Sequence, residues 1–322
     1  MALMHPGSVG VVVVNYSSLK YVQKCLDCLK SQKKLPDQVI VIDNSVRREC
    51  ELLRESHPGV VFICTGNNIG FAAANNRGIE LCETNYVALL NPDAFPEPDW
   101  LEKLTRAADQ APDFAAFGSL QLCNDDLEKI DGIGDCYHIS GLFWRECHGK
   151  ALKETNISAC EIFSPCAAAA LYRKSAIKEI GGFDEEFFCY GEDVDLGFRL
   201  RLAGFKAKFV PEAVVYHEGG ASSGGERSEF ATYYGHRNLV WVFIKNMPGI
   251  LFWLFLPLHV TLNIIAVFTL ALRGQGRVAL KAKSDAFRDI AQIWRKRKKM
   301  ESIRRVSISQ IYYILKKSPF HL

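Results

Sequence analysis

An acidic and aromatic stretch at residues 181–199, called here the acidic segment, carries the clearest chemical signal in the sequence. It holds six Asp or Glu side chains among Phe and Tyr residues, directly after a Gly-Gly pair. Close carboxylates repel one another and aromatic neighbours exclude water, so their pKa values are expected to rise. A carboxylate of this kind can abstract a proton near neutral pH. Glu192 and Asp193 are therefore candidates for a general base, and a solvated turn that caps a helix is the alternative.

The second half of the acidic segment fits a helix better than a strand. Apolar residues alternate from Val194 to Leu202, which alone is typical of a strand. Acidic residues come first, however, basic residues come last, and Gly204 follows the run, which is the order found in helices. A helix that begins near Glu192 places Glu192 and Asp193 in its first turn, facing the space that the aromatic residues enclose.

Polar side chains follow four short apolar runs in the first hundred residues. The runs, at residues 9–14, 39–42, 60–64 and 86–90, are predicted buried strands with helical stretches between them. This alternation predicts an open, mostly parallel α/β sheet flanked by helices. Ligands of such sheets bind at the carboxyl ends of the strands. The polar residues at those ends are Asn15, Asp43, Asn67, Asn68 and Asp93.

The chemistry of these strand ends points to a nucleotide and a metal ion. Asp43 can accept hydrogen bonds from a ribose or a base, and Gly70 lets the backbone approach a ligand closely at the start of a helix that favours phosphate. Asp93, which Pro92 holds in a tight turn, suits Mg²⁺ or Mn²⁺, because these ions take one or two protein carboxylates and complete their shell with water and diphosphate oxygens. Each carboxylate alone is more typical of a turn or cap than of a ligand site. Their repetition at successive strand ends predicts a site.

Two common classes of nucleotide-binding protein are excluded by the motifs. No GxGxxG follows the first predicted strand, which excludes the usual dehydrogenase fingerprint. No GxxxxGK[ST] occurs in the chain, which excludes a P-loop NTPase.

Five motifs together resemble glycosyltransferase family 2, and within it the bacterial rhamnosyltransferase-like enzymes of cell-surface polysaccharide biosynthesis. They are, in order, VVVVNY, VIDNS, NNIGFAAANN, LLNPDA and GGFDEEFFCYGEDVDLGFR, and the resemblance covers about residues 9–245. It implies a GT-A fold over residues 1–245, with the nucleotide-sugar half at about 1–100 and the acceptor half at 101–245. Residues 246–322 would form a hydrophobic hairpin and a basic tail.

The resemblance also implies roles for individual residues. Asp193 would be the catalytic base, and Asp93 and His217 would hold Mg²⁺ or Mn²⁺ against the sugar diphosphate. A hydrogen-bonded loop histidine is the alternative for His217. Trp144, at the end of an expected flexible loop over residues 131–144, and Glu192 would contact the acceptor. The expected contacts of the nucleotide sugar are Val14, Asn15, Asp43, Asn68, Gly70, Asn75 and Asn91.

Two departures from the family pattern affect the expected activity. Asn91 stands where many relatives carry an acid, which leaves the preferred ion open. The QxxRW element of processive polysaccharide synthases is absent, and the corresponding region reads YYGHRNLVW. We therefore expect transfer of a single sugar rather than polymerisation.

The implied reaction is an inverting, metal-dependent transfer of one sugar, with L-rhamnose from dTDP-L-rhamnose as the expected donor and a lipid-linked saccharide as the acceptor. Such a transfer needs a base for the acceptor hydroxyl and a metal to neutralise the departing diphosphate. A sugar nucleotidyltransferase is one alternative, although residues 14–20 (VNYSSLK) do not form its Gly-rich, basic phosphate loop. A non-catalytic nucleotide-sugar-binding scaffold is the other.

Residues 250–272 form a stretch without Asp, Glu, Lys or Arg. As a helix it would be roughly 34 Å long, enough to cross a bilayer. Basic residues flank it on both sides, which favours a hairpin bent near Pro257 with both ends in the cytoplasm over a single crossing. A buried helix pair at a homodimer interface is the competing explanation.

The charge of the chain is distributed unevenly. Its first 272 residues hold 25 Lys or Arg and 33 Asp or Glu, a net −8, whereas the last fifty hold fourteen and three, a net +11. A basic tail beside an apolar segment predicts attachment to anionic lipid at the cytoplasmic face of the inner membrane. Nucleic-acid binding is not expected, because no recognised fold or aromatic platform accompanies the tail.

The remaining composition agrees with a cytosolic enzyme. A chain of 322 residues is long enough for one large α/β domain and an appendage. Its eleven cysteines are scattered without the spacing of a disulfide framework, which indicates reduced thiols. The first apolar run is short and a polar Asn follows it, so we expect no signal peptide.

Overall fold

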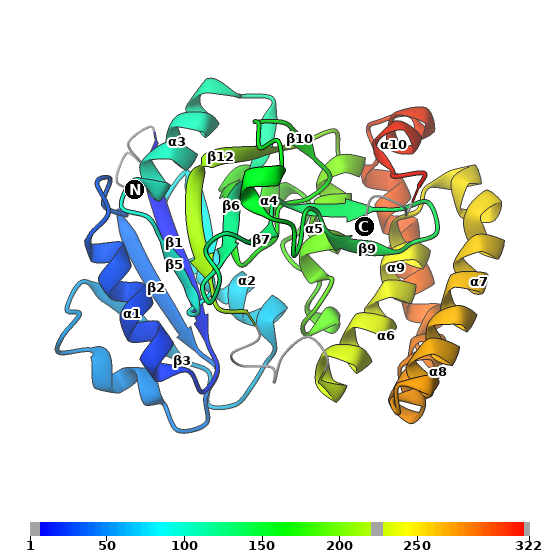
Figure 1. Cartoon of the computed structure of the whole chain (residues 1–322), viewed down its shortest axis with the longest axis horizontal. Coiled ribbons are helices and arrows are strands. Elements are labelled where there is room, and N and C mark those ends of the chain that lie inside the picture. The colour runs from blue at the N-terminus through cyan, green and yellow to red at the C-terminus, as the bar shows by residue number, and fades with distance from the viewer. Residues whose placement is uncertain (1–6, 220–227, 319–322) are drawn as a thin grey trace.

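A computed structural model of the chain describes residues 7–219 and 228–318. Its centre is a ten-stranded mixed sheet (Figure 1). Four neighbouring strands run parallel, in the spatial order β4-β1-β2-β3. They are β1 (Val9–Asn15), β2 (Gln38–Asp43), β3 (Val60–Cys64) and β4 (Tyr86–Leu90).

These four strands lie where the apolar runs predict them, with one difference in burial. The residues of β1 alternate between two hydrophobic clusters, with Val12 and Val14 in one and Val11 and Val13 in the other. Both faces of a central parallel strand are covered, as its continuous apolar sequence indicates. The prediction that the third strand is buried is wrong. β3 forms the edge of the sheet, and only Phe62 of its five residues is buried.

Helices cover both faces of this sheet. One face packs against α2, α4 and α5, and the other packs against α1 and α3. The helix predicted from the acidic segment is confirmed as α5, and Gly204 follows its end with φ +91°. The bounds are α1 (Leu19–Lys30), α2 (Phe71–Leu81), α3 (Trp100–Gln110), α4 (Lys174–Glu179) and α5 (Glu192–Leu202).

The sheet continues into the second half of the domain. β11 (Ala169–Arg173) runs antiparallel to β4 and to β6 (Phe114–Cys123), and β12 (Lys206–His217) runs parallel to β6. Residues from both halves of the domain therefore share one sheet, and the end of β4 meets the start of β11. Three short strands pair along this part: β5 (Ala94–Pro96) and β10 (Glu161–Ile162) with β12, and β7 (Ile130–Gly132) with β6.

The segment expected to be a flexible loop over residues 131–144 is instead largely a hairpin. It contains the end of β7 and the pair β8 (Asp135–Tyr137) and β9 (Phe143–Arg145). Tyr137 is fully buried and stacks on Phe163 with ring centroids 5.3 Å apart. This aromatic anchor explains the order, because a loop that buries a large side chain is held by its packing.

Five helices follow within the described residues 228–318, and the four longer ones, α6 to α9, pack together beyond the hairpin (Figure 1). The chain reverses at 273–275, and α8 packs back along α7. The bend predicted near Pro257 is wrong, because α7 continues through this residue. Their bounds are α6 (Glu229–Asn246), α7 (Gly249–Leu272), α8 (Gly276–Arg288), α9 (Ile290–Ile303) and α10 (Ile308–Ile314).

Packing against α6 explains why α7 continues through Pro257. Phe252 and His259, on either side of the proline, both contact Phe243 of α6, at ring-centroid distances of 5.5 and 4.0 Å. A proline removes one backbone hydrogen bond from a helix. Contacts before and after that point hold both parts of α7 against α6.

Part of the basic tail is used inside the fold. Lys283 donates to His236 O at 2.7 Å, and Arg297 donates to the carbonyl oxygens of Ile244 and Met247. Both cations are buried. The positive charge counted in the sequence is therefore larger than the charge that the tail presents to a surface.

Candidate active site

A cavity of about 890 Å³ lies where the carboxyl ends of β1 and β4 meet the first turn of α5 and the β8–β9 hairpin. It brings together residues that lie far apart in the sequence, including Asp93 and Asp193. Nine of the residues predicted for the site line it: Val14, Asn68, Gly70, Asn91, Asp93, Trp144, Glu192, Asp193 and His217.

Three predicted donor contacts do not line this cavity. Asn15 Nδ2 donates to Asp43 Oδ1 at 2.9 Å, and Asp43 also accepts hydrogen bonds from the amides of Ser45 and Cys50. Burial opposes ionisation of Asp43, but these hydrogen bonds outweigh it and lower its pKa. Asn75 donates to Phe71 O within α2. These side chains shape the strand ends and the helix start, and their contact with a nucleotide stays a prediction.

His217 links two carboxylates on one side of the cavity. β5 pairs with the end of β12, and this register places His217 opposite Ala94, the residue after Asp93. Its Nε2 lies 3.5 Å from Asp93 Oδ1, and its Nδ1 lies 2.8 Å from Asp131 Oδ2. Burial lowers the pKa of His217, but the hydrogen bonds and charges of Asp131 and Asp93 outweigh it and raise the pKa to about 9.

These residues fit a divalent cation. Asp131 holds Nδ1 of His217, which leaves the buried Nε2 facing the Asp93 carboxylate at 3.5 Å. A second carboxylate that orients a ligating histidine is common around metal ions. No group of three metal-ligating side chains occurs in the described part of the chain. An ion held here would therefore take its remaining ligands from water and a diphosphate, as Mg²⁺ and Mn²⁺ do.

Three carboxylates gather at the other part of the cavity. Gly191, with φ +79°, precedes α5 and directs Glu192 and Asp193 into its first turn. Asp193 Oδ2 accepts a hydrogen bond from Ala167 N at 3.2 Å, and burial raises its pKa. Burial, followed by the charge of Asp193, raises the pKa of Glu192 and of Asp135. The raised pKa values predicted for Glu192 and Asp193 are confirmed in direction.

The sequence did not single out Asp135 as a site residue. It also did not single out a basic turn at residues 145–150 on the same wall of the cavity. Arg145, His148 and Lys150 follow Trp144 and line the cavity, and both Arg145 and His148 contact Asp131. The signal available in the sequence was the charged run 145–150 (RECHGK) directly after the expected acceptor contact. The partner of this run, Asp131, could not be found without the hairpin.

Aromatic side chains complete the cavity wall. Phe188 and Tyr190 come from the acidic segment, and Phe230 comes from the start of α6. Phe230 contacts both, with ring centroids 6.3 Å and 6.2 Å away. Aromatic faces are suited to stacking against the apolar faces of sugar rings. The arrangement thus combines a half-buried carboxylate with a raised pKa, a carboxylate–histidine pair that fits a cation, and an aromatic wall in one cavity.

The sequence model described as glycosyl transferase family 2 matches residues 8–181, which is more than half of the chain. The chain belongs to this family. The resemblance drawn from the five motifs is confirmed, and the protein is a glycosyltransferase.

Two relatives and one solved structure show what this family 2 glycosyltransferase is similar to. It is 29% identical over 258 residues to the N-acetylglucosaminyl-diphospho-decaprenol L-rhamnosyltransferase of Mycobacterium tuberculosis, over 73% of this chain and 83% of the relative. It is 26% identical over 223 residues to rhamnosyltransferase WbbL of Escherichia coli K12, over 64% of this chain and 82% of the relative.

The solved structure is the mannosyltransferase PcManGT from Pyrobaculum calidifontis in complex with GDP-Man and Mn²⁺. It matches with a TM-score of 0.53 at 15% sequence identity, and the match covers 97% of this chain and 87% of that one. The likeness confirms the GT-A fold.

Proposed function

We propose that this family 2 enzyme is an inverting, metal-dependent glycosyltransferase that moves a single sugar from a nucleotide-diphosphate donor to an acceptor hydroxyl. The observation that carries the proposal is one cavity lined by the half-buried Asp193 and by the Asp93–His217 pair. An inverting transfer needs one group that takes the proton of the acceptor and another that neutralises the leaving diphosphate. Residues suited to both tasks line this cavity.

Asp193 is the base of this reaction. Burial raises its pKa, so its carboxylate takes up a proton more readily than that of an exposed Asp. The amides of Ala167 and Val194 donate to its two oxygens and fix its orientation. Glu192 and Trp144, which line the same cavity, contact the acceptor.

Asp93 and His217 hold Mg²⁺ or Mn²⁺ in this proposal. The bound ion neutralises charge on the diphosphate. The Mn²⁺ in the structure of PcManGT supports a divalent ion, and the Asn91-Pro92-Asp93 turn leaves the choice of ion open. Val14, Asn68, Gly70 and Asn91 contact the donor, while Asn15, Asp43 and Asn75 support the strand ends and helix on which these residues lie.

The relatives support a more specific donor and acceptor. Both are named as rhamnosyltransferases, and one is named for a diphospho-decaprenol substrate. We therefore take dTDP-L-rhamnose as the donor and a lipid-linked saccharide as the acceptor, in the synthesis of a cell-surface polysaccharide. These substrates place the enzyme at the cytoplasmic face of the inner membrane.

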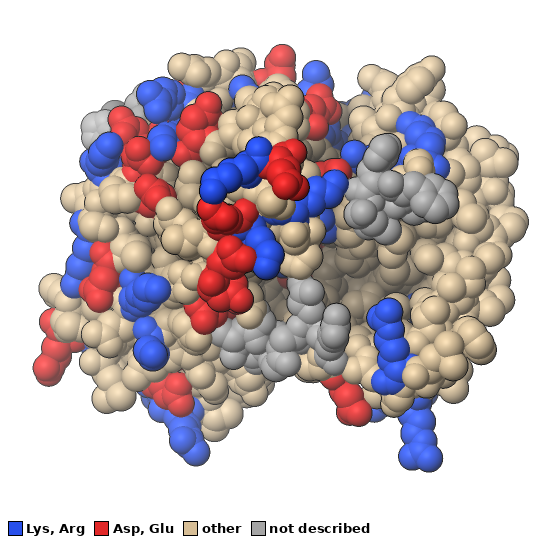
Figure 2. Space-filling model, in the orientation of Figure 1, with Lys and Arg blue, Asp and Glu red and all other residues tan. Residues whose placement is uncertain are grey.

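The surface of α7 supports attachment to that membrane as a monotopic protein. Among the described residues, α7 is the one helix long and apolar enough to cross a bilayer, and only 17% of its most apolar window is buried. Figure 2 shows an almost entirely uncharged surface over α7, at the right of the view. Its exposed side chains include Ile250, Trp253, Leu254, Leu258, Ile264, Ile265 and Phe268.

The neighbouring α8 returns along α7, so the two form a hairpin in which α7 exposes mainly apolar side chains and α8 adds Leu280 and Phe287. Exposed cations near it, among them Arg273, Arg295, Lys298 and Lys299, suit anionic headgroups. Co-sedimentation with phosphatidylglycerol vesicles tests this attachment. We expect Ile264→Glu to reduce binding at least tenfold and Leu52→Glu, at an exposed apolar residue far from α7, to leave it unchanged. Full-length protein that stays in the supernatant as a dimer would favour the homodimer interface instead.

A transfer assay tests the catalytic proposal. Full-length protein, dTDP-L-rhamnose, Mn²⁺ and a polyprenyl-diphosphate saccharide should yield a product longer by one sugar, and EDTA should stop the reaction. Asp93→Asn should weaken Mn²⁺-dependent binding of dTDP, whereas Asp126→Asn, at a surface turn, should not. Metal-independent transfer, or formation of a nucleotide sugar from a nucleoside triphosphate, would contradict the proposal.

A further inference from the structure

The turn that precedes the catalytic helix has an unfavourable backbone conformation. Phe188 has φ +66° and ψ −65°, and Cys189 N donates to Phe187 O at 2.8 Å. A γ-turn with positive φ at its centre is rare and strained. Tyr190, two residues later, also has a positive φ, of +65°. Such conformations persist only where the surrounding structure fixes them.

A single amide of α6 supplies most of this constraint. Asn238 is fully buried, and its Nδ2 donates to the carbonyl oxygens of Phe187 and Cys189 at 2.9 Å and of Tyr190 at 2.7 Å. The neighbouring Arg237 Nε donates to Asn238 Oδ1 at 2.9 Å. Because Asn238 Oδ1 accepts from a guanidinium, the NH₂ group must face the three carbonyls.

Arg237 adds a second set of contacts to the same turn. Its Nη2 donates to Glu186 O and to Phe187 O, both at 2.9 Å, and its guanidinium lies 4.1 Å from the ring centroid of Trp241. The side chain is thus held by packing as well as by hydrogen bonds. Arg237 and Asn238 belong to the YYGHRNLVW sequence that stands in place of the QxxRW element.

The turn also contacts the donor half of the domain. Phe188 O accepts hydrogen bonds from Phe71 N at 2.6 Å and Ala72 N at 3.2 Å, at the start of α2. Gly70 precedes them, and a Cβ at this position would lie 2.8 Å from Phe188 O. The turn is therefore held between α2 and α6, and the side chains of Phe188 and Tyr190 line the cavity directly before Glu192 and Asp193.

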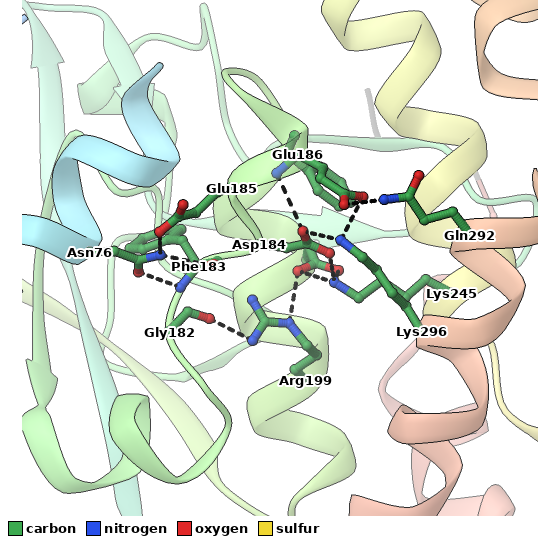
Figure 3. Close-up of polar contacts among 12 residues, drawn as sticks. Asn76, Gly182, Phe183, Asp184, Glu185, Glu186, Arg199, Lys245, Gln292 and Lys296 are labelled. Atoms are coloured by element: carbon green, nitrogen blue, oxygen red, sulfur yellow. Dashed lines mark hydrogen bonds and ion pairs between the residues drawn. The ribbon is translucent and has the colours of Figure 1, made fainter. Parts of the chain in front are cut away.

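A second anchor on α6 fixes the segments on either side of the turn. Lys245 lies seven residues after Asn238, two helical turns along the same side of α6. Its Nζ lies 2.6 Å from Asp184 and 2.9 Å from Asp195. Figure 3 shows Lys245 and Lys296 converging on Asp184. The acidic segment is thus attached to the C-terminal helices before the turn and again within α5.

From these contacts we infer that Asn238 is a positioning residue of the transfer reaction: it holds the turn at 187–190 in its strained form and thereby sets where Asp193 and the aromatic wall stand in the cavity. The inference rests on the proposed role of Asp193 as base. The inference assigns a function to the Arg237–Asn238 pair, which lies in the sequence that replaces the QxxRW element of processive synthases.

The substitution Asn238→Asp tests this inference, because it keeps the size of the side chain and turns the three donor contacts into repulsion between oxygens. We expect amide hydrogen exchange in residues 187–191 to become at least tenfold faster. We expect kcat to fall about 10²-fold, since a shift of about 1 Å in a reacting group costs on this order. The Kd of dTDP with Mn²⁺ should change less than threefold.

Gln32→Glu is the matched control. Gln32 is also buried, and its amide donates to the carbonyl oxygens of Glu97 at 2.8 Å and Cys28 at 3.4 Å, outside the cavity. It should change neither exchange at 187–191 nor kcat. If Asn238→Asp does not fold, Asn238→Ser, which retains one donor, is measured in the same way.

Either of two results would overturn the inference: unchanged exchange at 187–191 in the Asn238 variant, or faster exchange with kcat within twofold of the wild type. A wild-type protein that transfers no sugar would refute the proposed function instead. The exchange measurement would then still decide whether Asn238 holds the turn.

Discussion

Four carboxylates of the acidic segment form two groups with contrasting surroundings. Glu192 and Asp193 line the cavity, where burial raises their pKa values. Asp184 and Asp195 meet Lys245 instead. Burial alone would raise the pKa of Asp184, but the charges and hydrogen bonds of its two lysine partners outweigh it and lower the pKa. The expectation that crowding raises every pKa in the segment is therefore wrong for Asp184.

The contrast shows that the pKa of a buried carboxylate depends on whether a cation pairs with it, and not on how many other carboxylates lie nearby. In the interior, the loss of one partner of an ion pair leaves the other charge buried and uncompensated, which costs about 3–5 kcal/mol. A buried carboxylate without a cation keeps a high affinity for a proton. One short stretch of sequence thus provides two kinds of carboxylate. Asp184 and Asp195 form ion pairs with Lys245 (called here the brace), and Asp193 has a raised pKa in the cavity.

Replacing the base should give the largest effect. Asp193→Asn removes the proton acceptor while it keeps the size of the side chain, so kcat should fall by about 10²–10⁴-fold. Binding of dTDP with Mn²⁺, measured by calorimetry, should be unchanged. If the variant keeps the wild-type kcat, Asp193 is not the base, and the contrast between the cavity carboxylates and the ion-paired carboxylates has no catalytic meaning.

Removing the cation of the brace should mainly affect stability. Lys245→Met leaves Asp195 and Asp184 with fewer partners in a buried place and should lower the free energy of unfolding by about 3–5 kcal/mol. Lys103→Met, which breaks the more accessible pair with Asp99, should cost no more than about 1 kcal/mol. Urea unfolding of both variants measures the difference, and equal losses would show that Lys245 is not a brace.

The pH dependence should separate the two groups in the wild type. Asp193 works only when deprotonated and its pKa is raised, so transfer should fall about tenfold per pH unit below a midpoint that lies above the ordinary value of 3.8. The pKa of Asp184 is lowered, so its stabilising effect is present above 3.8 and is lost as the pH falls further. At pH values below the activity midpoint of Asp193 and above the pH at which Asp184 is protonated, the enzyme should be folded and inactive. Loss of activity and of structure at the same pH would contradict this.

A smaller effect should appear when the unpaired acid is neutralised. The pKa of Glu192 is raised in the folded state, so its contribution to stability is present below about 4.5 and is lost as the pH rises. Glu192→Gln should therefore raise the free energy of unfolding at pH 8 by about 1 kcal/mol and change it little at pH 4. Urea unfolding at the two pH values tests the sign, and a loss at pH 8 would show that Glu192 is paired.

Much of the donor side could be predicted because its signals are local. Each parallel strand is a continuous apolar run, and its polar end lies in the same few residues as the run. Asp93 and Glu192–Asp193 likewise sit at an identifiable strand end and helix start. Their shared cavity follows from the antiparallel pairing of β11 with β4, which connects the two halves.

The residues that escaped prediction depend on contacts between distant elements. Asp131 matters because β7 and β12 both pair with β6, which brings it to His217. Asn238 lies in the middle of an α6 sequence that reads as an ordinary helix, and nothing in it indicates three carbonyl partners. The continuation of α7 through Pro257 depends on Phe243, which the local sequence cannot reveal.

The run of α6 from the cavity wall to the base of α7 has a mechanical consequence. Phe230 lines the cavity at the start of α6. Lys245 and Asn246, at the other end of the same helix, donate hydrogen bonds to Asp195 of α5. Without a hinge along this helix, an enzyme resting on lipid through α7 carries its reaction centre at a height above the bilayer that the fold dictates. If the enzyme rests on lipid as proposed, this fixed distance would favour acceptors whose sugars extend from the membrane plane by the same amount.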